Sequence, residues 1–495
     1  MNRADKQNAI GNNIRSLREK RGLSQDRLSK LTDLSLNTIV KVESGKNPNP
    51  TVGTLLKIAS SLGVGLNDLV KFSVILLFLF ITAAKGHCED ILTWEDCLRE
   101  AGKNNPDLIS AVEGVNQQKA AKAVTASSLY PQVNSSLSAS RTRTESATTT
   151  AGAKPETVTN SFSYGVSGTQ LLFDGLKNIN DVKGASENIK AAEQNYRFTS
   201  SEVRLRLRTA FINLLKAQDL TLVTEDIVKM RRSDYELITL RYESGYEHRG
   251  ALLTAEASLA QANFQVAQAK REVELAQWQL TKELGRKEFI PVSVKGSYVV
   301  IDQAKEKPDF ETLAKNNPSL QQIIAQKNAA QFGLKSAYAD FLPKLTGSAG
   351  ANKSGSRWPA HNDQLDMGLV VSLPIFEGGL RLAQVSKADA LLKQLQADER
   401  STRDGIIVAL AQSWASLQDA IETVEVQNKQ LAAAQERATI AEIEYSTGFI
   451  TYDNWTIIQD NLVQAKTSFL NAQANALLAE ANWIQAKGEV LENAQ

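Results

Sequence analysis

The sequence predicts a mixed fold, in which a small all-α head precedes a larger body of long helices and β-strands. Residues 8–71 carry five short amphipathic helical patterns, separated by glycines and capping residues. Farther along, Gly184–Tyr242 contains no proline over nearly sixty residues, and a helix of that length is longer than about 80 Å. Four segments in which apolar and polar residues alternate predict four strands.

The charge of the chain differs between these two parts. Residues 1–71 contain 12 Lys and Arg against 6 Asp and Glu, whereas the rest contains 44 against 49. A basic head on a mildly acidic body suggests two unrelated functions. The three histidines and two cysteines are too few and too scattered for a Cys/His zinc site. We predict no metal site and no cofactor.

The head is predicted to contain helices at residues 8–20, 25–31, 36–42, 51–62 and 66–70. Ser24 and Ser35 are suitable N-caps for the second and third of these helices. Gly45 is expected to end the third helix. Leu28 and Leu31 are predicted to point into the core.

These residues resemble the Cro/repressor-type helix-turn-helix family, through the segments Gly22-Leu23-Ser24-Gln25, IVKVESG at 39–45 and Leu62-Gly63-Val64. The resemblance implies that residues 36–42 enter the major groove of DNA. Its base-facing positions are Leu36, Asn37 and Lys41, while Gln25 braces the protein on the DNA backbone. Asn37 would read adenine, and Leu36 would touch a thymine methyl group. The resemblance also implies an ion pair between Arg18 and Glu43. The alternative for Asn37 and Lys41 is a solvated helix face.

Residues 72–86 have the pattern of a secretory signal peptide, although they lie inside the chain. Lys71 precedes the apolar segment Phe72–Ala84, and Ala84-Lys85-Gly86 is a small-x-small cleavage pattern. The apolar segment is short for a membrane span. We predict cleavage after Gly86, with a buried core helix as the alternative. Cys88 and Cys97 then either form a short disulfide in an oxidising compartment or remain free thiols.

The body, residues 87–495, contains the same design twice. Asn105-Pro106 recurs as Asn317-Pro318, 212 residues later, and Gly245 recurs as Gly448, 203 residues later. The two repeats are residues 92–286 and 304–489. The difference of nine residues is expected in the polar stretches 141–160 and 352–364, which we predict to be surface loops.

Each repeat is predicted to contain a helix, two strands joined by a loop, a long helix, a turn and a further helix. The strands show period two, as in Leu365, Met367 and Leu369, which is typical of membrane-barrel staves. Four strands do not close a barrel, and a sheet edge with unpaired backbone groups is excluded from lipid. Closure of the barrel therefore needs several copies of the chain. Heptad-like spacing, as in Ala262 and Ala269, predicts helices packed side by side.

The body resembles the TolC-like outer-membrane efflux family over nearly all of residues 92–489. The motifs are the duplicated Asn-Pro, the PIFEGG segment at 374–379 and a Tyr-x-x-Gly turn in each repeat. The resemblance implies a homotrimer with a 12-stranded β-barrel in outer-membrane lipid, four strands per chain. Below the barrel it implies a helical coiled-coil tunnel through the periplasm. The implied partners are a periplasmic adaptor protein and an inner-membrane pump.

In the family, the helical turns at the far end of the tunnel close it and receive the adaptor. The predicted tip residues are therefore Tyr242, Gly245, Tyr445, Gly448, Asp453 and Asn454. Tyr445 matches the tyrosine with which family members often close the tunnel. Ile450 stands at the arginine position and Asn454 at an aspartate position, which puts a cation-trapping acidic ring in doubt. The neighbouring Glu247, His248 and Arg249 either act instead or are solvated turn residues.

No catalytic motif is present, so we predict a passive exit duct of an efflux or type I secretion system, not an enzyme. Residues 87–495 are expected in the cell outer membrane. The alternative is a DNA-binding transcriptional regulator, in which residues 1–71 alone bind DNA and stay in the cytoplasm. Three hypotheses explain the combination of a DNA-binding head and an outer-membrane body. The reading frame of a duct was joined to that of an upstream regulator, or the protein is a genuine fusion that is cleaved after Gly86. In the third hypothesis the protein is a transcription factor whose body, residues 87–495, acts as a sensor. We favour the first, because signal peptides are not normally internal.

Overall fold

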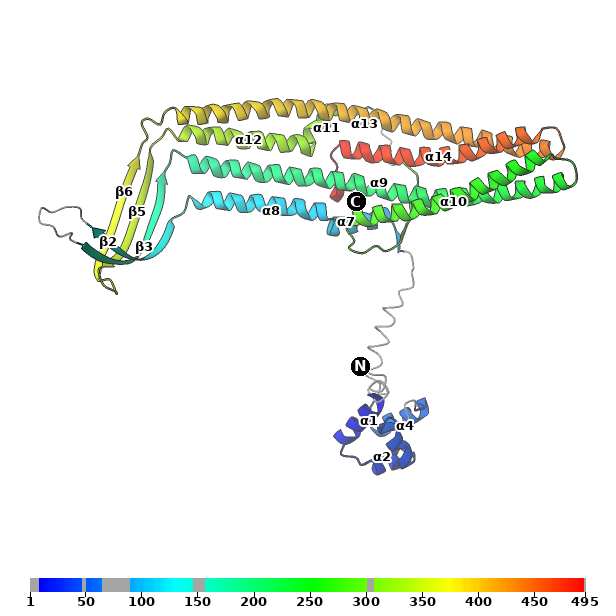
Figure 1. Cartoon of the computed structure of the whole chain (residues 1–495), viewed down its shortest axis with the longest axis horizontal. Coiled ribbons are helices and arrows are strands. Elements are labelled where there is room, and N and C mark those ends of the chain that lie inside the picture. The colour runs from blue at the N-terminus through cyan, green and yellow to red at the C-terminus, as the bar shows by residue number, and fades with distance from the viewer. Residues whose placement is uncertain (1–8, 47–49, 65–89, 146–155, 301–306, 494–495) are drawn as a thin grey trace. The chain divides into compact units, whose positions relative to one another are not determined.

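The computed structural model describes residues 9–46, 50–64, 90–145, 156–300 and 307–493 (Figure 1). The chain divides into two compact units, Met1–Glu89 and Asp90–Gln495. The predicted helix at 66–70, the signal-like segment 72–86 and Cys88 lie outside the described residues. Cys97 is a buried free thiol, and burial raises its pKa to about 12.

Within its described residues, the first unit has the helices α1 Ala9–Lys20, α2 Gln25–Thr32, α3 Leu36–Glu43 and α4 Val52–Ser61. Ser24 and Ser35 cap α2 and α3 as predicted, since their side chains accept hydrogen bonds from the backbone N–H of Arg27 and Thr38. The core is built from Ile14, Leu28, Ile39, Val42, Leu55, Ile58, Ala59 and Leu62.

The prediction that Leu31 points inward was wrong, because this side chain is 56% exposed. The inner face of α2 instead runs through Leu28, Ser29 and Thr32. The hydroxyl of Thr32 donates to the carbonyl of Leu28 at 2.8 Å, so a polar residue is buried there without losing its hydrogen bond. The hydrophobic pattern alone did not distinguish these two faces of a short helix.

The second unit repeats one order of elements. In the first repeat the helices are α7 Trp94–Asn104, α8 Pro106–Ser127, α9 Lys177–Glu243 and α10 Arg249–Leu284. In the second they are α11 Phe310–Asn316, α12 Pro318–Ala339, α13 Leu380–Ser446 and α14 Tyr452–Ala486. A short 3-10 helix, η2, covers Leu491–Asn493. Both α9 and α13 have 67 residues, which corresponds to about 100 Å.

The long helices pack in pairs through small residues. On α10, four alanines spaced seven residues apart are buried: Ala255, Ala262, Ala269 and Ala276. Helix α10 packs mainly against α9. A heptad repeat of small side chains allows two helices to approach closely along their length. This confirms the coiled-coil pattern expected from the sequence.

Four strands form one antiparallel sheet in the order β2-β3-β5-β6. Their bounds are Gln132–Glu145, Glu156–Phe173, Lys344–Gly355 and Asn362–Ser372. The polar stretches predicted as loops are therefore partly strand, since pairing continues from Arg141 opposite Asn160 to Glu145 opposite Glu156. Arg141 and Arg143 stand there at the positions that apolar residues hold earlier in β2, while threonine, which suits a strand, continues the polar face.

The register places the apolar residues of all four strands on one face. Leu137 lies opposite Tyr164, Val166 opposite Ala351, and Ala351 opposite Leu365. Because successive side chains point to opposite faces, the second face carries mainly Ser, Thr, Asn and Gln. The sheet lies at one end of the long helices, and the helical turns lie at the other (Figure 1).

The duplicated Asn-Pro motif joins helices in the middle of this unit. The side chain of Asn105 caps α8 and donates to the carbonyl of Glu283 at the end of α10 at 2.9 Å. Asn317 caps α12 and donates to the carbonyl of Ala486 at the end of α14 at 3.1 Å. Each proline follows at the first helical position, where a backbone N–H would have no partner within the helix, so its absence costs no hydrogen bond. A parallel pair of strands, β1 Asp90–Leu92 and β4 Val292–Val294, was not predicted.

Candidate functional site

The two helical turns at the end away from the sheet have the same backbone geometry. Gly245 follows α9 with a φ of 78°, and Gly448 follows α13 with a φ of 81°. A Cβ at either position would meet no atom within 4 Å. Glycine is therefore required by the left-handed backbone and not by crowding. The next residue in each turn is an exposed aromatic, Tyr246 or Phe449.

Tyr445 joins the two turns to each other. Its side chain is 2% exposed, and its ring stacks on that of Trp455 with a centroid distance of 4.6 Å. Its hydroxyl donates to Oε1 of Glu247, in the turn between α9 and α10, at 2.6 Å. Burial and this hydrogen bond raise the pKa of Tyr445. A side chain of the second repeat is therefore fixed to a carboxylate of the first.

Arg241 completes this link between the hairpins. The central carbon of its guanidinium lies 4.6 Å from the centroid of the Tyr445 ring, within the range of a cation–π contact. Its Nε lies 4.0 Å from Glu247, an ion pair without a hydrogen bond. The sequence indicated Tyr445 and Glu247 but gave no role to Arg241 or Trp455. The spacing of Tyr452 and Trp455 on one helix face was the available signal.

The other predicted tip residues are at the surface. Tyr242, Asp453 and Asn454 are exposed. Asn454 lines a groove of about 690 Å³ between α13 and α14, together with Glu436, Arg437, Ile440, Glu444, Ile450, Ile457 and other residues. His248 accepts a hydrogen bond at Nδ1 from the backbone N–H of Ala251 at 3.1 Å. His248 therefore caps α10, and Arg249 is the first residue of that helix.

A partly buried ionic cluster lies near the tips, with Asp460 at its exposed edge. Arg231 and Asp234 are on α9, with Nη1 of Arg231 3.7 Å from Oδ2 of Asp234. Arg231 also contacts Asp460 on α14. Burial raises the pKa of Asp234 to about 6, an effect opposed by Arg231 and reinforced by the charge of Glu442.

Asp234→Asn is expected to stabilise the duct at pH 7.5. A carboxyl group with a raised pKa binds its proton more tightly in the folded state, so folding stability falls as the pH rises from about 4 to about 6. Asparagine removes this cost of about 1–3 kcal/mol. Thermal unfolding should show a higher midpoint for the variant at pH 7.5 and no difference near pH 4. The control Asp226→Asn, at an exposed surface pair with Lys229, should give no increase. A lower midpoint for Asp234→Asn at pH 7.5 would contradict the assignment.

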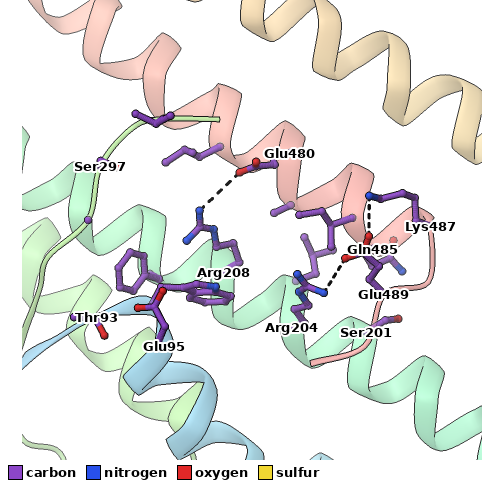
Figure 2. Close-up of a pocket in the computed structure, with 18 of the residues that line it drawn as sticks. Thr93, Glu95, Ser201, Arg204, Arg208, Ser297, Glu480, Gln485, Lys487 and Glu489 are labelled. Carbon is purple, nitrogen blue, oxygen red and sulfur yellow. Dashed lines mark hydrogen bonds and ion pairs between the residues drawn. The ribbon is translucent and has the colours of Figure 1, made fainter. Parts of the chain in front are cut away.

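A cavity of about 1020 Å³ lies between α9, α14 and the segment after β4. In Figure 2, Arg208 points toward Glu480, and Arg204 points toward Glu489. The guanidinium of Arg208 also lies 4.8 Å from the ring centroid of Trp94, and burial lowers its pKa. The lining contains four cationic and three acidic side chains but no histidine or cysteine. Its charges therefore largely compensate one another.

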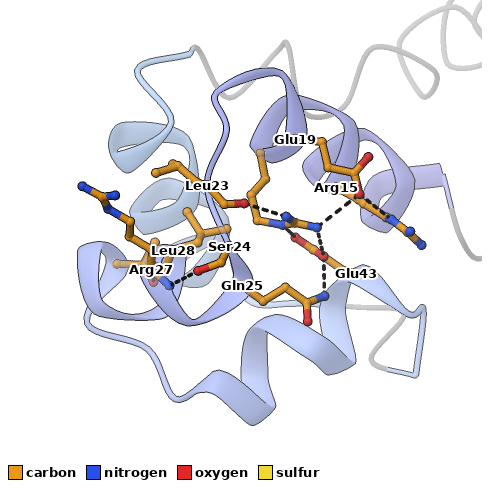
Figure 3. A network of polar contacts seen from close by, with 10 residues as sticks. Arg15, Glu19, Leu23, Ser24, Gln25, Arg27, Leu28 and Glu43 are labelled. Carbon is orange, nitrogen blue, oxygen red and sulfur yellow. Dashed lines mark hydrogen bonds and ion pairs between the residues drawn. The ribbon is translucent and has the colours of Figure 1, made fainter.

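In the first unit, one predicted DNA-binding residue, Gln25, belongs to a buried polar network. Nε of Arg18 donates to Oε1 of Glu43 at 2.7 Å, which confirms the expected ion pair. In Figure 3, Gln25 points toward Glu43, and its amide donates to Oε2 at 2.7 Å. Leu36, Asn37 and Lys41 are exposed on α3. Gln25 is therefore held in place by the residue that also pairs with Arg18.

The part of the chain that the structure describes contains neither a cluster of metal ligands nor a membrane-crossing helix. No group of three or more His, Cys, Asp or Glu side chains is placed to hold a metal ion. None of the helices in the described ranges combines the length and the apolar character needed to cross a membrane.

The sequence model of the family described as outer membrane efflux protein matches residues 97–286 and 310–489, one segment in each repeat. The chain belongs to this family. It is accordingly an outer-membrane efflux channel protein and not an enzyme. A helix-turn-helix model matches residues 14–69.

Curated relatives and solved structures agree with this family. The outer membrane efflux protein BepC of Brucella suis is 24% identical over 376 residues, 74% of this chain and 78% of BepC. The pyoverdine export outer membrane protein OpmQ of Pseudomonas aeruginosa is 24% identical over 402 residues, 74% of this chain and 81% of OpmQ.

Among solved structures, CusC superposes with a TM-score of 0.72 at 20% identity, covering 80% of this chain and 92% of that one. VceC of Vibrio cholerae gives 0.68 at 18% identity, covering 80% and 96%. The predicted fold class of helical head, long helical pairs and four antiparallel strands is confirmed.

Proposed function

We propose that three copies of residues 87–495 close a 12-stranded barrel in the outer membrane and form a passive exit duct. The observation that carries this proposal is the sheet, which has one apolar face and two edge strands, β2 and β6. Neither edge strand has a partner on its outer side within the described chain. Unpaired backbone groups are too costly in lipid, so the edges must pair with those of other copies.

The aromatic residues of the sheet support its placement in a bilayer. Phe162 and Tyr164 pack against Trp358 at one end, with centroid distances of 6.3 and 5.5 Å. Phe173 ends β3 at the other end, opposite Leu345. Phe162 and Phe173 are eleven residues apart. For a strand tilted by about 40°, this separation spans about 27 Å in height, close to the apolar band of outer-membrane barrels.

The helical tips are the proposed site of closure and of adaptor docking. The link from Tyr445 to Glu247 holds the two hairpins of one chain together, which favours a closed end. The groove that contains Asn454, together with exposed Tyr246 and Phe449, offers apolar surface to a helical adaptor. Relatives are named for pyoverdine export and for alkaline protease secretion. A periplasmic adaptor and an inner-membrane pump would complete such a system here.

We also propose that the mature duct begins near His87. Residues 72–86 combine a charged start, an apolar segment and a small-x-small cleavage pattern. N-terminal sequencing of the protein recovered from the outer membrane should give a start within a few residues of His87. A start before Phe72 on such material would contradict both the signal assignment and the joined-frame hypothesis.

Residues 1–71 have a second proposed function, binding DNA in the cytoplasm apart from the duct. The helix-turn-helix match and the exposed face of α3, with Leu36, Asn37 and Lys41, favour it. The proposed DNA contacts also include Gln25, whose amide is oriented by Glu43. A DNA-binding head and an exported barrel do not function together in one intact chain. The nucleotide sequence upstream of Lys71 therefore decides between a joined frame and a genuine fusion.

A further inference from the structure

We propose that a small polar cavity between α9, α10 and α14 binds one water molecule, which joins the helical hairpin of the first repeat to that of the second. The cavity has a volume of about 10 Å³, which is about the least space that holds a water molecule and too little for a larger ligand. Arg231 and Asp234 of α9 line it, together with Ser258 of α10 and Trp455 and Gln459 of α14. The site lies within one chain, so the inference does not depend on the proposed assembly.

Two polar atoms on α14 are buried at this cavity without a hydrogen-bond partner among the residues that the structure describes. They are Nε1 of Trp455 and Oε1 of Gln459, in residues that are 3% and 5% exposed. Residues four apart share one face of a helix, so both meet the same neighbours. The indole N–H only donates and the amide oxygen only accepts, so these two atoms need a ligand that does both. Left without one, each atom would destabilise the fold.

The ion pair on α9 provides the other two partners. Nη1 of Arg231 lies 3.7 Å from Oδ2 of Asp234, which is too far for a direct hydrogen bond. Both side chains line the cavity, so one water molecule can hydrogen-bond to both. This water accepts from Arg231 and Trp455, and it donates to Asp234 and Gln459. Its two lone pairs and two hydrogens are then all used, within the range of two to four hydrogen bonds that buried waters make.

The donors at the cavity favour water over a small cation such as sodium. A cation would be ligated by the oxygen atoms of Asp234 and Gln459, but it would lie beside the positive charge of Arg231, which is buried at the same place. It would also leave the indole N–H of Trp455 unsatisfied, because that group has no lone pair to offer. Helix α10 contributes Ala255 and Ser258, and neither carries a charge that would offset the arginine.

X-ray footprinting of the protein purified from membranes, read by mass spectrometry, tests the proposal. Hydroxyl radicals formed from a bound water oxidise the side chains that touch it, even where bulk solvent does not reach. Trp455 should therefore be oxidised although it is 3% exposed. The matched control is Trp483, which is 1% exposed within an apolar cluster and should stay unmodified. Oxidation of Trp455 that does not exceed that of Trp483, while the exposed Trp278 is oxidised in the same sample, would overturn the inference.

Gln459→Leu keeps the size of the side chain and removes the acceptor. It should lower the thermal unfolding midpoint and reduce the oxidation of Trp455 toward that of Trp483, because the water loses a partner. Gln464→Leu, at an exposed position of the same helix, should change neither. A higher midpoint for Gln459→Leu would contradict the proposal, since a dry cavity gains from losing an unsatisfied polar atom. A wild-type midpoint that rises with sodium chloride but not with choline chloride would also contradict it, because the occupant would then be a cation.

Discussion

Glu43→Ala is expected to unfold the N-terminal unit. The side chains of Arg18 and Glu43 are 9% and 2% exposed, so the variant leaves a buried guanidinium without its carboxylate. Breaking a buried ion pair by removing one partner costs about 3–5 kcal/mol. A domain of this size has little more stability than that to lose. Circular dichroism of residues 1–71 should therefore show loss of helix at 25 °C, and DNA binding should be lost with it.

Two matched variants separate folding from recognition. Glu19→Ala removes an exposed partner of Arg15, whose Oε1 also lies 3.4 Å from Nη2 of Arg18, and should leave the helical content unchanged because exposed ion pairs contribute little. Asn37→Ala should leave the helical content unchanged while weakening binding to a specific site by about 1–3 kcal/mol, with little effect on random DNA. A folded Glu43→Ala variant would show that the network does not hold this unit together. Equal losses on both DNAs for Asn37→Ala would remove Asn37 from base recognition.

Gly448→Val is expected to abolish most export while leaving oligomer assembly intact. A β-branched residue at a φ of 81° is strained by more than about 1–2 kcal/mol, so the turn must change its path. That change would displace Phe449 and the start of α14, and with them the link between Tyr445 and Trp455. Accumulation of a fluorescent efflux substrate in cells that depend on this protein would measure the loss. Gly245→Val should act in the same way at the first turn.

The control for this variant is the same substitution on the same helix. Gly405 lies within α13, has no positive φ, and has open space where a Cβ would be. Gly405→Val should export normally, since valine is a better helix former than glycine. Unchanged export in both Gly448→Val and Gly245→Val would remove the turns from the docking and closure site.

Local features of this fold could be predicted from the sequence because they depend on neighbouring residues. Ser24, Ser35, Gly245 and Gly448 each act within one helical turn, and the structure places them as caps and left-handed residues. The alternation of the strands likewise fixed their apolar face. The ends of the strands were misjudged, because polar segments rich in threonine extend the pairing and Val158 is their only apolar residue.

Contacts between distant residues could not be predicted in the same way. Tyr445 and Glu247 are 198 residues apart, and no pattern in either turn specifies the partner of the other. The role of Asn105 required knowledge that α10 ends beside α8. Leu176 adopts a φ of 68° at the position where the second repeat has Gly379. Nothing in the sequence indicates that a leucine occupies a left-handed conformation there.

The oligomeric state tests the central claim most directly. The sheet of one chain has two unpaired edges, and four strands are too few to close around a pore. Light scattering of the detergent-purified outer-membrane protein, corrected for bound detergent, should give the mass of three chains. A stable single chain that retains its sheet would contradict the proposal that this protein forms a duct by assembling copies of itself.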